Sequence, residues 1–174
     1  MSNTQVYDQT TKLLHWLIAA LIYCLVFFHP SSEEGHAQPH KWVTDIHVTL
    51  GTLLLALAVW RVIWRMEYAH VPPAPLAEKW QLKSRQLTHF ILYLFMLLAP
   101  IGGLLISLTT PIEVNIFGLI EMPRLINDEA IHALMRSLHG FSADVLLYLG
   151  VLHVLAVLYH QVWLKDSLLK RMFM

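Results

Sequence analysis

The sequence predicts an all-α integral membrane protein, a four-helix bundle with both termini in the cytoplasm. Four long apolar stretches alternate with polar segments, and apolar residues make up 56% of the 174 residues. Charged residues make up only 14%, against roughly 25% in soluble proteins. A chain of this length is expected to form one domain over residues 1–174 that contacts membrane lipid. Because the formal net charge is zero, the composition gives no indication of a nucleic-acid partner.

The spanning helices are expected at about residues 10–29, 42–65, 80–108 and 137–165. Crossing the hydrocarbon core takes about 20 residues, and the last three stretches reach this length directly. The first reaches it if its helix begins near Asp8 or Thr10, both suitable N-caps. In the loop before the fourth span, Asn127 is expected to cap a short amphipathic helix that extends to Arg136.

The placement of lysine and arginine predicts the orientation, because cytoplasmic loops carry an excess of these residues. With the N-terminus inside, only Lys41, Arg124 and Arg136 lie on the outer side. The remaining cations lie on the cytoplasmic side: Lys12, Arg61, Arg65, Lys79, Lys83, Arg85, Lys165, Lys170 and Arg171. Both termini are therefore expected in the cytoplasm.

Five of the eleven histidines lie in or near the start of an apolar stretch: His15, His47, His89, His139 and His153. An ionisable group inside a membrane is costly and needs a partner. A single such histidine is more often a packed side chain bonded to a backbone carbonyl than a ligand. Five of them in four helices favour a shared ligand.

His139 and His153 are the most informative pair because they lie on one helix. Fourteen residues correspond to about 21 Å of rise and a rotation of about −40°, so the two imidazoles share a face at two depths. This arrangement suits two haems stacked across a membrane. Gly150 lies on the same stripe and Gly51 follows His47 by one turn, and a glycine lets a flat porphyrin approach the backbone.

The depth of each histidine predicts its partner across the bundle. The second helix enters from the outer side, so His47 is expected at the level of His139. The first and third helices enter from the inside, so the inner partner of His153 is either His15 or His89. Arg61 and Arg136 are candidates for the propionates of the inner and outer haem, although Arg61 is equally well an interfacial anchor.

Two axial imidazoles on each iron leave no open position, so such a centre transfers electrons and does not readily bind oxygen. A zinc site explains histidines on opposite helices at two levels less well, since zinc prefers a tetrahedron. Cys24 is the single cysteine, so it forms neither an intrachain disulfide nor a cysteine metal cluster. A small transporter or channel is a remote alternative that leaves the histidine pattern unexplained.

The ordered residues resemble the prokaryotic cytochrome b561 family, which includes superoxide:ubiquinone oxidoreductases. The likeness spans nearly the whole chain and consists of short motifs that are weak singly and strong in this order. They are His15-Trp16, Ile46-His47-Val48 with Gly51, Arg61 with Arg65, the proline-rich inner loop, His89 with Leu92-Tyr93-Leu94, Pro100-Ile101-Gly102, Phe117-Gly118, His139, Gly150, His153, His160, Lys165-Asp166, and a tail of Leu168-Leu169-Lys170-Arg171-Met172.

The resemblance implies a membrane cytochrome with two haem b per chain in the bacterial inner membrane. It implies that His15 and His153 hold the inner haem, and His47 and His139 the outer one. It also implies ubiquinone or menaquinone as the exchangeable substrate near the inner haem, for which His89, His160 and Lys165 are candidate contacts.

The expected role is electron transfer between an outer-side donor and the membrane quinone pool, either as a carrier or as a superoxide oxidase. The outer loops hold eight acidic residues against three bases, and a field of that sign favours a cationic redox protein and repels superoxide. The acids are Glu33, Glu34, Asp45, Glu113, Glu121, Asp128, Glu129 and Asp144.

Overall fold

The computed structural model describes residues 7–30, 40–68, 79–165 and 169–173. Its long helices are α1 (Gln9–Phe27), α2 (Lys41–Glu67), α3 (Lys79–Ser107) and α4 (Glu129–Tyr159), and the last continues as one π-helical turn, η1 (His160–Leu164). Two short strands, β1 (Asn115–Ile116) and β2 (Ile120–Glu121), form a hairpin before α4, and α5 (Lys170–Phe173) closes the described part. Each of the four long helices is long and apolar enough to cross a membrane, which confirms the predicted all-α, four-helix membrane fold.

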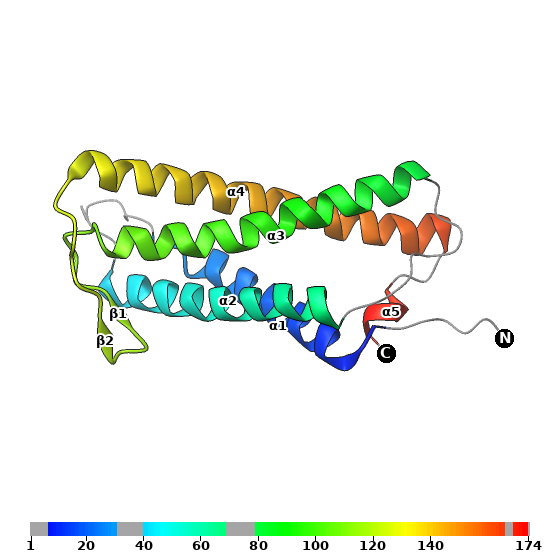
Figure 1. The fold of residues 1–174 in the computed structure, drawn as a ribbon, viewed down its shortest axis with the longest axis horizontal. Helices are drawn as coiled ribbons and strands as arrows, with labels where there is room; N and C mark the ends of the chain where they lie inside the picture. The colour runs from blue at the N-terminus through cyan, green and yellow to red at the C-terminus, as the bar shows by residue number, and fades with distance from the viewer. Residues whose placement is uncertain (1–6, 31–39, 69–78, 166–168, 174) are drawn as a thin grey trace.

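The helices run alternately up and down (Figure 1). Helices α1 and α3 run from the end at which α5 lies to the end at which the hairpin lies, and α2 and α4 run back. Helix α2 packs against α1 and α3, and α3 packs along α4. Helix α5 is fixed to α1, because the indole N–H of Trp16 donates to the carbonyl of Met172 over 3.3 Å.

The start of α1 follows the sequence pattern. The Asp8 carboxylate accepts the backbone N–H of Thr11 over 2.8 Å and the Thr11 hydroxyl over 2.6 Å. It also accepts the indole N–H of Trp64 from α2 over 3.1 Å. Asp8 therefore caps α1 and joins it to the end of α2.

The start of α4 differs from the sequence pattern. Helix α4 begins at Glu129 and continues without a break, so the separate amphipathic helix expected from Asn127 to Arg136 does not form. Asp128, rather than Asn127, is the cap, and its carboxylate accepts the N–H groups of Ala130 and Ile131. No proline interrupts the first turns, so the capped helix continues directly into the membrane span.

The bundle has a small core and an apolar exterior. The buried cluster takes residues from every long helix: Ile18, Leu54, Ala58, Met96, Ala99 and Leu146. Large apolar side chains such as Phe90, Leu152 and Trp163 are exposed on the outside. This distribution is expected where lipid rather than water surrounds a helix bundle. The sequence features at Glu33, Glu34 and Pro72–Pro75 lie outside the described residues.

Candidate functional site

The structure brings the helix-borne histidines together in two groups, one towards each end of the bundle. Near the hairpin end, the rings of His47 from α2 and His139 from α4 have centroids 6.2 Å apart. Near the α5 end, the rings of His15 from α1 and His153 from α4 have centroids 6.4 Å apart. The two groups are separated along α4 by fourteen residues, about 21 Å of helix rise.

These separations fit a metal ion held between two imidazoles. A metal–imidazole nitrogen bond is about 2 Å, and a ring centroid lies about 1.1 Å behind its nitrogen, so two trans imidazoles have centroids about 6.3 Å apart. His89 from α3 also lies beside His153, with ring centroids 5.5 Å apart. That distance is shorter than a trans pair requires, so the geometry favours His15 over His89 as the partner of His153.

Backbone carbonyls orient both imidazoles of the hairpin-end pair. His47 Nδ1 lies 3.1 Å from the Phe28 carbonyl, and His139 Nδ1 lies 2.8 Å from the Ala99 carbonyl. A carbonyl oxygen only accepts, so Nδ1 carries the proton in both rings. Nε2 of each ring then keeps its lone pair, which is the tautomer that a metal ligand needs.

Two glycines of α3 make room for His139, and the sequence reading did not assign them this role. A Cβ built at Gly102 would lie 3.3 Å from the His139 Cβ, and one at Gly103 would lie 3.2 Å from its Cε1. Both distances are shorter than ordinary van der Waals contacts. The signal available in the sequence was the Pro100-Ile101-Gly102-Gly103 segment within an apolar helix.

Arg61 occupies the α5-end group. Its Nη2 lies 3.3 Å from His15 Nδ1, its Nε–H donates to the Tyr93 hydroxyl over 3.3 Å, and its guanidinium lies 5.8 Å from the Tyr93 ring centroid. Its Nη1 is buried and has no hydrogen-bond partner among the described residues. A buried guanidinium nitrogen without an acceptor is costly, so this position suits an anionic group such as a propionate.

The glycines expected to face a porphyrin border open space. A Cβ added at Gly51 or at Gly150 would meet no atom within 4 Å. Gly51 follows His47 by one turn and Gly150 precedes His153 by three residues. The histidine pairs, the Arg61 guanidinium and this open space all fit haem as the bound group.

The other candidate residues are less closely associated with the histidine pairs. Arg136 is exposed on α4. His160 begins η1, with its ring 6.2 Å from that of Tyr159, and Lys165 ends the turn in a left-handed conformation. Beside them Gln161 has a buried Oε1 with no hydrogen-bond partner in the described part of the chain.

Arg124 and Arg136 form a cationic group at the hairpin end. Arg124 and Arg136 both act electrostatically on His132, whose Nδ1 lies 2.8 Å from the Thr109 hydroxyl. Neither arginine forms a salt bridge with another described residue. Arg124 comes from the loop before α4, and His132 and Arg136 come from the first turns of that helix.

The fold and these histidines define a helical membrane protein suited to bind haem. A model of the prokaryotic cytochrome b561 family matches residues 6–174, so the chain belongs to this family of membrane cytochromes, which implies haem b binding.

Three named relatives are similar to this chain over nearly its whole length. Cytochrome b561 homolog 2 of Escherichia coli (strain K12) is 28% identical over 170 residues, with 95% of this chain and 90% of that protein covered. Cytochrome b561 homolog 1 of the same organism is 27% identical over an alignment of 177 residues, covering 98% and 95%. A Yersinia pestis protein named probable superoxide oxidase CybB is 28% identical over 166 residues, covering 91% and 90%.

Proposed function

We propose that this protein is a dihaem membrane cytochrome that carries electrons between an outer-side donor and the membrane quinone pool. The observation that carries the proposal is the pair of interhelical histidine contacts, with centroids 6.2 and 6.4 Å apart at two levels of one bundle. The two contacts use histidines fourteen residues apart along α4 and have similar separations, which supports two ligand pairs stacked along the bundle.

In this proposal His47 and His139 hold one haem b, and His15 and His153 hold a second. A bound haem would supply one-electron chemistry, and a pair of imidazoles that holds its iron would suit electron transfer. The Phe28 and Ala99 carbonyls orient the first pair of ligands. Arg61 is placed to donate to a propionate beside the second pair, and Arg136 is the candidate donor at the hairpin end.

The orientation and location are part of the proposal. The excess of lysine and arginine at the α5 end supports a cytoplasmic location for that end and for both termini. The family is prokaryotic, which supports the bacterial inner membrane. The hairpin end then faces outwards.

Ubiquinone or menaquinone is the proposed exchangeable substrate at the inner end. His89 and His160 are candidate donors to a quinone carbonyl, and Lys165 follows at the interface. The π-helical turn supports this position, because such turns occur frequently at functional sites. The Gln161 Oε1, which has no hydrogen-bond partner among the residues that the structure describes, offers an acceptor for a quinol hydroxyl.

The acidic outer loops favour a cationic redox protein as the donor. A second candidate, superoxide, has specific support in the cationic group of Arg124 and Arg136, which both act electrostatically on His132 and would attract an anion locally. One relative is named a probable superoxide oxidase. With this donor the protein is an oxidoreductase that uses quinone as acceptor.

Haem stoichiometry tests the core of the proposal. A pyridine-haemochrome assay on purified protein should return two haem b per chain, and His47→Ala and His153→Ala should each lose one. Because each variant retains the other pair, its remaining low-spin spectrum reports that the bundle is folded. One haem per chain in the wild type would refute the dihaem assignment.

A further inference from the structure

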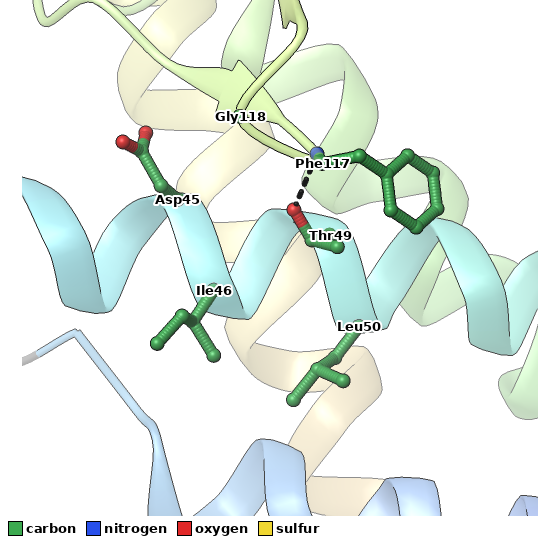
Figure 2. A pocket seen from close by; sticks show the side chains of 6 residues that line it. All are labelled: Asp45, Ile46, Thr49, Leu50, Phe117 and Gly118. Carbon is green, nitrogen blue, oxygen red and sulfur yellow. Dashed lines mark hydrogen bonds between the residues drawn. The ribbon is translucent and has the colours of Figure 1, made fainter.

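The β1–β2 hairpin is fixed against the side of α2. The N–H of Asn115 donates to the Asp45 carboxylate over 2.8 Å. The N–H of Phe117 donates to the Thr49 hydroxyl over 2.9 Å (Figure 2). Lys41 adds a third bond, because its ammonium donates to the Glu113 carbonyl over 3.0 Å. The hairpin therefore lies along α2 for two turns of helix.

The tip of the hairpin is apolar and exposed. Phe117 is 54% exposed, Leu119 is 86% exposed and Ile120 is 58% exposed. Phe117 and Gly118 have φ values of 55° and 65°, so the turn adopts a left-handed conformation that presents these side chains outwards. In water this exposure of large apolar groups on a short hairpin would be unfavourable.

An open groove of about 290 Å³ lies between this tip and α2. Figure 2 shows Asp45 and Thr49 on the hairpin side of α2, while Ile46 and Leu50 extend from the other side of the helix. All four residues line the groove. The Asp45 carboxylate is already bonded to Lys41 and to the Asn115 N–H, and the Thr49 hydroxyl accepts the Phe117 N–H. The surface left for an occupant is mainly hydrocarbon.

The groove continues the lipid-facing stripe of α2. Leu53 and Trp60 lie within about 40° of Thr49 on a helical wheel, and both are exposed. His47 lies about 160° from Thr49, on the face that packs inwards. The groove therefore opens to the membrane and is separate from the histidine site.

We infer that the hairpin is an interfacial anchor and that its groove holds an acyl chain of an outer-leaflet phospholipid. Thr49 lies eight residues after Lys41, so the tip lies about 12 Å down the helix from its polar first turn. At that depth unsatisfied backbone groups are costly. Asp45 and Thr49 accept the two N–H groups, which explains two polar residues on the lipid-facing side of an apolar helix.

The headgroup charge should have little effect on this lipid. The Lys41 ammonium lies 3.1 Å from the Asp45 carboxylate, so the cation at the rim of the groove is offset. We expect phosphatidylglycerol and phosphatidylethanolamine to occupy the groove to a similar extent. The acyl chain supplies the contact, because the free walls are apolar.

Fluorescence quenching in vesicles tests the depth of the tip. Cys24 is first replaced by serine, because it is the single cysteine. A fluorophore is then attached at Leu119→Cys and, as the matched control, at Asn127→Cys in the exposed loop before α4. Lipids brominated near the headgroup end of the acyl chain should quench the label at position 119 at least several-fold more than the control, and aqueous iodide should show the reverse.

The same experiment can overturn the inference in two ways. Equal quenching of both labels by iodide would place the tip in water, and protection of position 119 from both quenchers would show that protein, such as a second copy of the chain, covers it. Each signal is referred to the same variant without quencher, which removes constant quenching by haem.

Native mass spectrometry tests the groove. The wild type should retain one phospholipid, of either headgroup, and Leu50→Trp should lose it because the indole fills the groove. Leu53→Trp lies on the same stripe just beyond the groove and should retain it. Equal lipid retention by both variants would refute the groove as the site, and an unchanged haem spectrum in both would show that the histidine site is intact.

Discussion

The imidazole of His139 donates from Nδ1 to the backbone carbonyl of Ala99 over 2.8 Å. This bond joins α4 to α3 one residue before Pro100, where the helix lacks a backbone donor. It fixes both the tautomer and the ring orientation of His139, so α3 determines the geometry of a ligand carried by α4.

The glycines that admit His139 provide the first prediction. In Gly103→Ala the new methyl group lies 3.2 Å from His139 Cε1, so the ring must shift by a few tenths of an ångström. We expect a changed midpoint potential of the outer haem, and we expect Gly103→Val to lose that haem. Ile101→Ala, on the exposed side of α3, is the control. Redox titration checks this, and identical titrations for Gly103→Val and the control would contradict it.

Removing the Arg61 cation should lower the midpoint potential of the inner haem. A nearby positive charge stabilises the reduced, less positive form, so Arg61→Gln should shift the equilibrium towards the oxidised form. A tenfold change corresponds to about 59 mV for one electron, and we expect a shift of that order. Potentiometric titration measures it. Arg65→Gln, at an exposed position one turn on, should change the potential much less.

His89→Ala distinguishes the two possible partners of His153. If His89 contacts quinone rather than iron, the variant should retain two low-spin haems while quinol reduces it at least tenfold more slowly. The structure motivates this expectation through the 5.5 Å separation of His89 and His153. Loss of the inner haem in the variant would instead make His89 the ligand. His15→Ala should instead lose the inner haem, because His15 is the proposed partner of His153.

The salt dependence of reduction identifies the donor. Reduction by a basic protein should slow as salt screens its attraction to the acidic loops. If superoxide instead is the donor and meets the cationic group, its reaction should also slow with salt, and Arg136→Gln should reduce the low-salt rate several-fold. If the net outer charge dominates, the superoxide reaction should quicken with salt. Stopped-flow measurements with each donor separate these cases, and Arg85→Gln at the opposite end is the control.

Asp8 should make stability sensitive to acid. Burial raises the pKa of this carboxyl, but hydrogen bonds from Thr11 and Trp64 outweigh it, and the net pKa lies below its usual value of 3.8. A lowered pKa contributes stability that is complete above about pH 3.8 and is lost as pH falls through the folded-state value. Asp8→Ala should cost about 1 kcal/mol at neutral pH. Thermal unfolding in detergent should show that the variant loses less stability than the wild type on acidification.

The sequence alone determined the four spans and the placement of His139 and His153 on one face. Both follow from local rules, because a run of apolar residues sets a membrane helix and a fixed rotation per residue sets its faces. The start of α4 was placed wrongly, because the amphipathic helix expected from Asn127 to Arg136 is the first part of α4, which Asp128 caps and which continues into the span.

The tertiary structure alone decided which groups meet across helices. The contact of Arg61 with His15, the closeness of Gly103 to His139 and the attachment of the hairpin to Asp45 and Thr49 depend on the rotation of each helix about its axis. The packing of whole helices sets that rotation, and no short sequence pattern encodes it.

The tertiary structure also decides how charges are distributed at the outer end. A count of acids and bases predicts a repulsive surface for an anion, and the structure adds that Arg124 and Arg136 both act electrostatically on His132. An electrostatic interaction depends on distance as well as on total charge.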